Sequence, residues 1–282
     1  MKQIFSIGRS GILTAALAAL LLGGCASRPS DPDALAYYLE TGDPLEPMNR
    51  AIFQFNEITD KVILRPAAIG YRAVVPKGVR AGIHNFLTNL KSPITILNAL
   101  LQGEGVRARD TFGRFMTNTI LGLGGLIDIA SDAGIPQHYE DFGQTLAVWG
   151  VEPGPYLVLP LLGPSNFRDG IGAGIDGAID PFGRYIGNEY GPEGAAVRYT
   201  LNALDWRASN LKTIDDLRNS SLDFYATVRS GFRQRRAHDI RNGRLPDGDF
   251  TGGPGVIDFD NMDMDMEPPP DGAPENGKTN NQ

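Results

Sequence analysis

The chain has 282 residues, a formal net charge of −7, 41% hydrophobic residues, 35 glycines, 20 prolines and a single cysteine. This length is enough for one domain with a sizeable core, and a single cysteine excludes a disulfide framework within one chain. The abundance of glycine and proline predicts short elements with many interruptions.

The acidic charge belongs to the end of the chain. Residues 246–282 hold nine Asp and Glu side chains against one lysine, Lys278, whereas residues 25–245 are nearly neutral. The net charge therefore indicates nothing about a ligand of the main body. Residues 246–282 also contain too few apolar side chains to form a core, so we expect a disordered acidic tail.

The first 24 residues have the pattern of a bacterial export signal. Lys2 and Arg9 precede a mostly apolar stretch over residues 12–22, which is too short to span a bilayer. The signal ends in Leu-Gly-Gly-Cys, which is typical of a lipoprotein and predicts lipidation of Cys25. Several acyl chains on one residue suffice for stable anchoring. Ala26, where aspartate would favour the inner membrane, predicts the outer membrane; the alternative is an ordinary signal that leaves an odd cysteine.

Residues 25–43 are expected to form a tether, and residues 44–245 a helical domain. Apolar residues at helical spacing predict a first helix that begins at Pro44 and ends at Arg65-Pro66, because the residue before proline avoids the α region. Proline at the first helical position predicts a second helix at Pro76. A third is expected from Ser92-Pro93 to Gly103, and a fourth over residues 105–121.

The second half is more irregular. We expect a short helix over residues 141–148, a glycine-diluted helix over residues 166–179, and strongly helical sequence over residues 192–240, with a phase slip after Leu211 and a kink or end at Gly231. The apolar stretch G-P-Y-L-V-L-P-L-L-G-P at residues 154–164 is too short for a membrane span. Pro160 makes it a poor central strand, so we expect an irregular or edge-strand segment with one side buried against the helices and Pro160 where no ladder N–H is needed.

The sequence offers no convincing catalytic or metal site. His84, His138 and His238 lack a metal-binding spacing, and Ser165 lies outside any nucleophile motif, so Ser165 or Asn166 is expected to cap the following helix. We therefore predict no catalytic residue, no metal and no cofactor. An exported lipoprotein is also an implausible partner for nucleic acid.

The basic stretch over residues 229–244 has two interpretations. It is either a solvated face or a surface that contacts anionic lipid head groups through Arg233, Arg235 and Arg236, since basic residues near a charged membrane gain about 1 kcal/mol each.

The glycine cluster Gly122, Gly124 and Gly125 also has two interpretations. It has neither the spacing of a dinucleotide-binding fingerprint nor the Lys-Ser/Thr of a P-loop. It forms either a tight apolar turn or a mobile hairpin beside a lipid-facing cavity, because glycine allows the backbone to flex.

Six separated motifs between residues 40 and 240 resemble the MlaA (VacJ) lipoprotein family, in the expected order. They are D-P-L-E-P-M-N-R with F-Q-F-N (43–56), R-P (65–66), N-A-L-L-Q-G (98–103), N-T-I-L-G-L-G-G-L-I-D (118–128), F-G-Q-T-L (142–146), and the 154–164 stretch with R-D-G (168–170). The acidic tail is not part of this pattern.

The resemblance implies a mainly α fold: a ring-like disc of short amphipathic helices that lies in one leaflet of the outer membrane, with little or no β structure. It implies an amphipathic channel, gated by the glycine-rich hairpin, that removes mislocalised phospholipids from the outer leaflet. The expected partners are phospholipids, trimeric general porins, and an MlaC-like periplasmic carrier that serves an ABC transporter. The protein would be lipid-anchored at the periplasmic face of the outer membrane. A structural tether without transport is the alternative, and a lipid hydrolase a second one.

Overall fold

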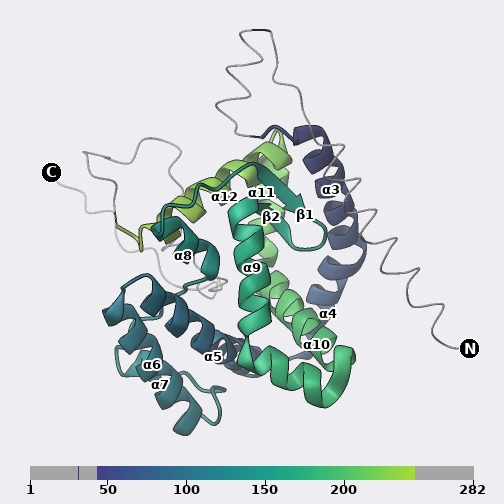
Figure 1. Cartoon of the computed structure of the whole chain (residues 1–282). Helices are drawn as coiled ribbons and strands as arrows, with labels where there is room; N and C mark the ends of the chain where they lie inside the picture. Colours follow the sequence, from purple (N-terminus) through teal and green to yellow (C-terminus); the bar gives the residue numbers. More distant parts are fainter. Residues whose placement is uncertain (1–30, 32–42, 245–282) are drawn as a thin grey trace, which may run out of the picture.

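The computed structural model describes residue 31 and residues 43–244. Within these residues the fold is mostly helical, and its one sheet has two strands, which confirms the predicted fold class. Figure 1 shows the helices α5–α8 gathered on one side, α3 and α4 on the other, and α9 between them. The predicted export signal, Cys25 and the predicted acidic tail over residues 246–282 lie outside the described residues.

The first helical segment runs further than expected. Helix α3 (Glu46–Thr59) continues through a π-helical turn, η1 (Asp60–Leu64), into α4 (Arg65–Val74). The predicted stop at Arg65-Pro66 is therefore wrong. The N–H of Arg65 bonds the carbonyl of Asp60, five residues back, and this wider turn leaves room for the proline ring.

A second proline was also misjudged. Helix α5 (Lys77–Leu101) begins after Pro76, as predicted to within one residue, but it contains Pro93 in its interior. The predicted helix start at Ser92-Pro93 is thus wrong: packing along α5 outweighs the loss of one backbone hydrogen bond. Helix α5 ends before Gly103, whose φ of 79° suits glycine, and packs against α6 (Gly105–Ile120).

Two short helices follow, α7 (Ile129–Asp132) and α8 (Phe142–Val148), with Asp128 and Asp141 as their N-caps. The apolar stretch at residues 154–164 then forms the antiparallel hairpin of β1 (Tyr156–Leu159) and β2 (Gly163–Asn166). Pro160 lies in the connection between the strands, where strand pairing needs no backbone N–H. Tyr156 and Val158 are buried against Tyr225. Both results confirm the expectation for this stretch.

Helix α9 (Phe167–Ile179) begins with Asn166 as its cap, whereas Ser165 is a buried strand residue. The remaining helices are α10 (Pro181–Ser209), kinked at Gly191, α11 (Leu211–Ser220) and α12 (Phe224–Ile240). The phase slip in the sequence marks the break between α10 and α11, and α12 passes through Gly231 without ending there.

The distribution of side chains is inverted relative to an ordinary globular core. Among the described residues ten hydrophobic side chains are buried, half of them alanines, against eighteen polar or charged ones, while thirty-four large hydrophobic side chains are exposed. Helix α6 shows why: Phe112, Met116 and Ile120 face outward, and the opposite stripe, which includes Arg114 and Asn118, faces inward. Such a surface is stable in contact with an apolar medium.

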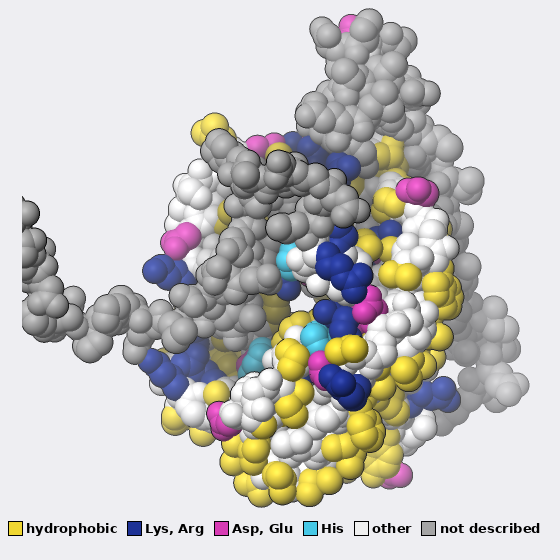
Figure 2. All heavy atoms as spheres, turned by 90° about the vertical axis from the view of Figure 1, so that its left-hand side faces the viewer, with side chains coloured by type: hydrophobic (Ala, Val, Ile, Leu, Met, Phe, Trp, Pro, Cys, Tyr) yellow, Lys and Arg dark blue, Asp and Glu magenta, His cyan; other side chains and the backbone are white. Residues whose placement is uncertain are grey.

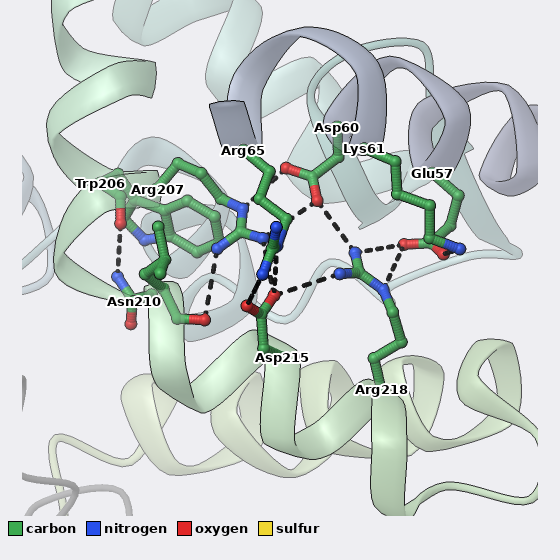
Figure 3. Close-up of polar contacts among 10 residues, drawn as sticks. Glu57, Asp60, Lys61, Arg65, Trp206, Arg207, Asn210, Asp215 and Arg218 are labelled. Atoms are coloured by element: carbon green, nitrogen blue, oxygen red, sulfur yellow. Dashed lines mark hydrogen bonds and ion pairs between the residues drawn. The ribbon is translucent and has the colours of Figure 1, made fainter. Parts of the chain in front are cut away.

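Charged side chains take over part of the packing that apolar residues usually provide. Figure 3 shows Arg207 and Arg218 between the α3–η1 segment and α11. Arg207, only 2% exposed, donates to Asp60 at 2.7 Å and to Asp215 at 3.2 Å. Arg218 donates to Glu57 at 2.6 Å and to Asp60 at 2.9 Å. We call Arg65, Arg207 and Arg218, together with the carboxylates that they bind, the arginine clamp.

Candidate functional site

A polar pocket lies between α5 and α6. Helix α5 contributes one face, α6 another, and the loop at residues 137–139 closes a third side; the space outside the atoms is about 520 Å³, including solvent at its open mouth. From α5 come His84, Thr88, Lys91, Ser92 and Thr95, and from α6 Thr111, Arg114 and Asn118.

Figure 2 views the molecule from the side on which α5, α6 and α8 lie in Figure 1. This face is hollowed near its centre, and basic, acidic and histidine side chains gather around the hollow. Hydrophobic side chains cover the lower edge of the same face. The arrangement therefore joins a polar interior to an apolar rim.

The α6 wall of the pocket is held by one ion-pair network. Arg114 donates to Asp128 at 2.6 Å, and Asn118 and Ser131 bond the same carboxylate at 2.9 and 2.6 Å. Burial alone would raise the pKa of Asp128, but these hydrogen bonds and the charge of Arg114 outweigh it and keep the pKa below its usual range. Asp128 therefore stays ionised and is committed to Arg114.

The glycine-rich segment over residues 121–128 joins this network to the pocket wall. It is a compact turn: a Cβ on Gly122 would lie 2.1 Å from the carbonyl oxygen of Ile127. Gly124 and Gly125 have φ of 75° and 100°, which L-residues rarely adopt. Asn89, on the pocket side of α5, donates to the carbonyl of Gly124 at 3.4 Å and would collide with a Cβ on Gly125 at 2.6 Å.

The apolar side chains of this turn are exposed, namely Leu121, Leu123, Leu126 and Ile127. The structure thus contains the tight apolar turn that was one of the two interpretations. The other interpretation, a moving gate, remains a prediction.

Three basic side chains line the α5 side of the pocket and the loop at residues 137–139, namely His84, Lys91 and His138. His84 lies 2.8 Å from Asp205 of α10, and His138 lies 3.5 Å from Asp110. Burial and the charge of Arg107 lower the pKa of His138. Partial desolvation also lowers the pKa of Lys91, an exposed cation at the centre of this wall.

The basic stretch of α12 is placed only partly at the surface. Arg236 makes two 2.6 Å hydrogen bonds to Asp141 and an ion pair of 2.8 Å with Asp169, so it joins α12 to α8 and α9. Arg233 and Arg235 are exposed, and Arg235 pairs with Asp239 at 2.9 Å. Lipid contact by this stretch remains a prediction for Arg233 and Arg235, while Arg236 is committed to two carboxylates.

The remaining sequence candidates are placed as follows. Cys25 is outside the described residues. Ser165 bonds the backbone of Asn166 in β2 and has no histidine beside it among its hydrogen-bond partners in the described part of the chain. Over residues 43–244, no cluster of three His, Cys, Asp or Glu side chains could hold a metal ion. None of the helices in this range combines the length and apolarity needed to cross a membrane.

Sequence reasoning did not identify the α5 wall of the pocket. The signal was nevertheless present, because Thr88, Lys91, Ser92 and Thr95 follow the spacing i, i+3, i+4 and i+7, which places them on one helix face. In a chain whose apolar faces point outward, such a polar stripe marks the interior.

Comparison with known proteins decides the family. The model of the MlaA lipoprotein family matches residues 41–239 of this chain. The chain belongs to the MlaA lipoprotein family. This confirms the resemblance seen in the sequence motifs.

Individual MlaA proteins agree over most of the chain. The "Intermembrane phospholipid transport system lipoprotein MlaA" of Haemophilus influenzae Rd is 37% identical over 238 residues, which covers 83% of this chain and 92% of that protein. The protein of the same description from Escherichia coli K12 is 36% identical over 256 residues, with coverage of 89% and 97%. A solved structure described as "Structural basis for maintenance of bacterial outer membrane lipid asymmetry" superposes with a TM-score of 0.63 at 38% identity, covering 70% of this chain and 98% of that one.

Proposed function

We propose that this MlaA-family chain removes mislocalised phospholipids from the outer leaflet of the outer membrane and passes them to a periplasmic carrier for retrograde transport. The observation that carries the proposal is the inverted distribution of side chains: an apolar exterior surrounds a polar hollow. A phospholipid has apolar acyl chains, which suit the apolar exterior, and a polar head group, which suits the polar hollow. The descriptions of the relatives name phospholipid transport. The protein acts by transport and not as an enzyme.

The membrane arrangement follows from the same surface. Exposed apolar side chains on α3, α4, α6 and α10 would lie among acyl chains, so the helices form a disc in one leaflet that needs no spanning helix. Cys25 would anchor the mature chain at the periplasmic face, with residues 25–43 as the tether and residues 246–282 as a free tail. Trimeric general porins and an MlaC-like carrier are the proposed partners.

The transport proposal is tested by deleting the gene and labelling surface phosphatidylethanolamine with a membrane-impermeant amine reagent. Deletion should raise the labelled fraction and lower detergent resistance, and the intact gene should restore both. The Cys25→Ser variant should fail to restore them, because its anchor is lost. If deletion leaves surface labelling and detergent resistance unchanged, the protein is a structural tether and the transport proposal fails.

The gate role of the glycine-rich turn is tested by Gly124→Pro. Proline cannot adopt the φ of 75° found here, and it removes the N–H that donates to the carbonyl of Thr119 at 3.0 Å. Gly124→Pro should therefore change the conformation of the turn. If the turn is the gate, the rate of lipid removal should change while the protein stays folded and membrane-bound. Gly70→Ala, in open space on α4, is the control. A transport rate equal to that of the wild type would contradict the gate assignment.

A further inference from the structure

The polar pocket contains one cation whose charge no neighbour neutralises directly. Lys91 has no hydrogen bond or ion pair among the described residues, although its side chain lines the pocket. Partial desolvation lowers its pKa, the charge of Arg198 lowers it further, and Asp205 and Asp180 oppose the shift from a distance. The Lys91 side chain is exposed at the pocket wall, so an anion that enters the pocket can reach its ammonium and supply the counter-charge that the protein does not.

The other charged groups of the lining are already paired. Asp128, the one carboxylate among the lining residues, is bound by Arg114, and His84 bonds Asp205 outside the pocket. Among the charged residues that line the pocket, Lys91 is thus the one without a directly paired opposite charge. An anionic guest meets no free carboxylate at this wall.

Neutral donors surround the lysine in a suitable arrangement. Thr88 lies three residues before Lys91, Thr95 four residues after it, and Ser92 directly follows it; with Lys91 they form one polar stripe of α5 that lines the pocket, and within the described residues their hydroxyl groups make no hydrogen bond. One ammonium with several hydroxyl groups suits a group with several acceptor oxygens, such as a phosphate.

The edge of the pocket favours a lipid over a free ion. Asn85, a lining residue, donates to the carbonyl of Leu126 at 3.4 Å, so the apolar turn lies directly beside the polar wall. Leu126 and Leu123 are exposed there. A head group in the pocket would place its acyl chains next to these side chains, whereas inorganic phosphate would leave them in contact with water.

We propose that this pocket binds the phosphate group of a phospholipid, with the Lys91 ammonium as its counter-charge and the hydroxyl groups of Thr88, Ser92 and Thr95 as hydrogen-bond donors. This inference rests on the proposed transport function, since a phospholipid must reach the hollow. It adds the chemical group that is recognised and the residues that recognise it.

The test measures binding to the full-length lipidated protein in nonionic detergent by isothermal titration. The probes are dihexanoyl phosphatidylglycerol, dihexanoylglycerol, which lacks the phosphate, and inorganic phosphate. Lys91→Met should weaken binding of the phospholipid about tenfold, the effect expected for loss of a charge-assisted hydrogen bond. Lys91→Arg should bind within about twofold of the wild type, as should the matched control Lys212→Met, an equally exposed lysine on α11 that does not line the pocket. Dihexanoylglycerol should bind all four proteins equally.

Two results would overturn the proposal. One is equal affinity of the wild type and Lys91→Met for the phospholipid; the other is inorganic phosphate competing at the same concentration as the lipid, which would identify a free-phosphate site. Thr88→Val, which leaves the charge intact, should weaken phospholipid binding about threefold and provides a second measurement if Lys91→Met does not fold. Failure of the transport function is read separately, from surface labelling in the deletion strain, so the two hypotheses fail by different experiments.

Discussion

Two asparagines of α3 bind the outer edge of the β-hairpin, and removing the buried one should be costly. The Asn49 amide donates to the carbonyl of Tyr156 at 2.9 Å and accepts the N–H of Val158 at 2.9 Å. Asn56, two turns later, does the same for Leu159 and Leu161. The edge strand thereby obtains the hydrogen bonds that a third strand would have supplied.

The cost of Asn49→Ala follows from what it leaves unpaired. Asn49, Tyr156 and Val158 are buried, and the backbone groups of Tyr156 and Val158 would lose their partners. The buried Asp43 would also lose the Asn49 donor on Oδ1, at 2.7 Å, but keeps Tyr225 and Arg229 on Oδ2, so the two backbone groups set the cost. Each orphaned group costs about 1–3 kcal/mol, which gives about 4 kcal/mol in total. For a domain of this size about 1 kcal/mol corresponds to roughly 2–4 °C in Tm, so we expect a fall of roughly 8–16 °C.

The matched control is Asn56→Ala. Leu161 is 64% exposed, so water can replace the lost amide, and the cost should be about 1 kcal/mol. Circular dichroism melting of both variants in the same nonionic detergent measures the difference. Equal Tm shifts for the two variants would show that the burial of the paired groups does not set the cost, and would refute this reasoning.

Two further predictions concern the glycine-rich turn and the arginine clamp. Gly125→Ala should lower Tm more than Gly124→Ala, because both positions have positive φ but only Gly125 would also press a Cβ against Asn89 at 2.6 Å; equal melting temperatures would contradict the close approach. Hydrogen bonds from arginine hold the pKa of Asp215 below its usual range, and they outweigh burial to do the same for Asp60. Their stabilisation is therefore fully present above the unfolded pKa of about 4 and is lost as the pH falls through the depressed values. Asp215→Asn should flatten the loss of Tm between pH 5 and pH 3 relative to the wild type, and parallel profiles would argue against the clamp as the cause.

The local elements were largely predictable from the sequence, and the exceptions have a common origin. The short helix that starts near Asp141, the N-cap at Asn166 and the end of α5 before Gly103 are decided by neighbouring residues, so short-range patterns found them. Pro66 and Pro93 were misjudged because their outcome depends on a π turn and on tertiary packing along α5.

The site was predictable only in part. The glycine cluster stood out because of its composition, but the polar stripe of α5 is ordinary until the apolar faces are known to point outward. The pairing of Arg236 with Asp141 and Asp169 joins residues that are far apart in the chain, which no local pattern predicts. The sequence contains these charges without indicating which of them meet.

The inverted distribution of side chains also has a thermodynamic consequence. Unfolding an ordinary domain exposes apolar surface and raises the heat capacity, whereas exposing polar surface lowers it. Here the buried side chains are mostly polar and the large apolar ones are already in contact with their surroundings. The heat-capacity change of unfolding should therefore be small for the size of the domain. The free energy of unfolding then varies gently with temperature, so that this fold resists cold as well as heat.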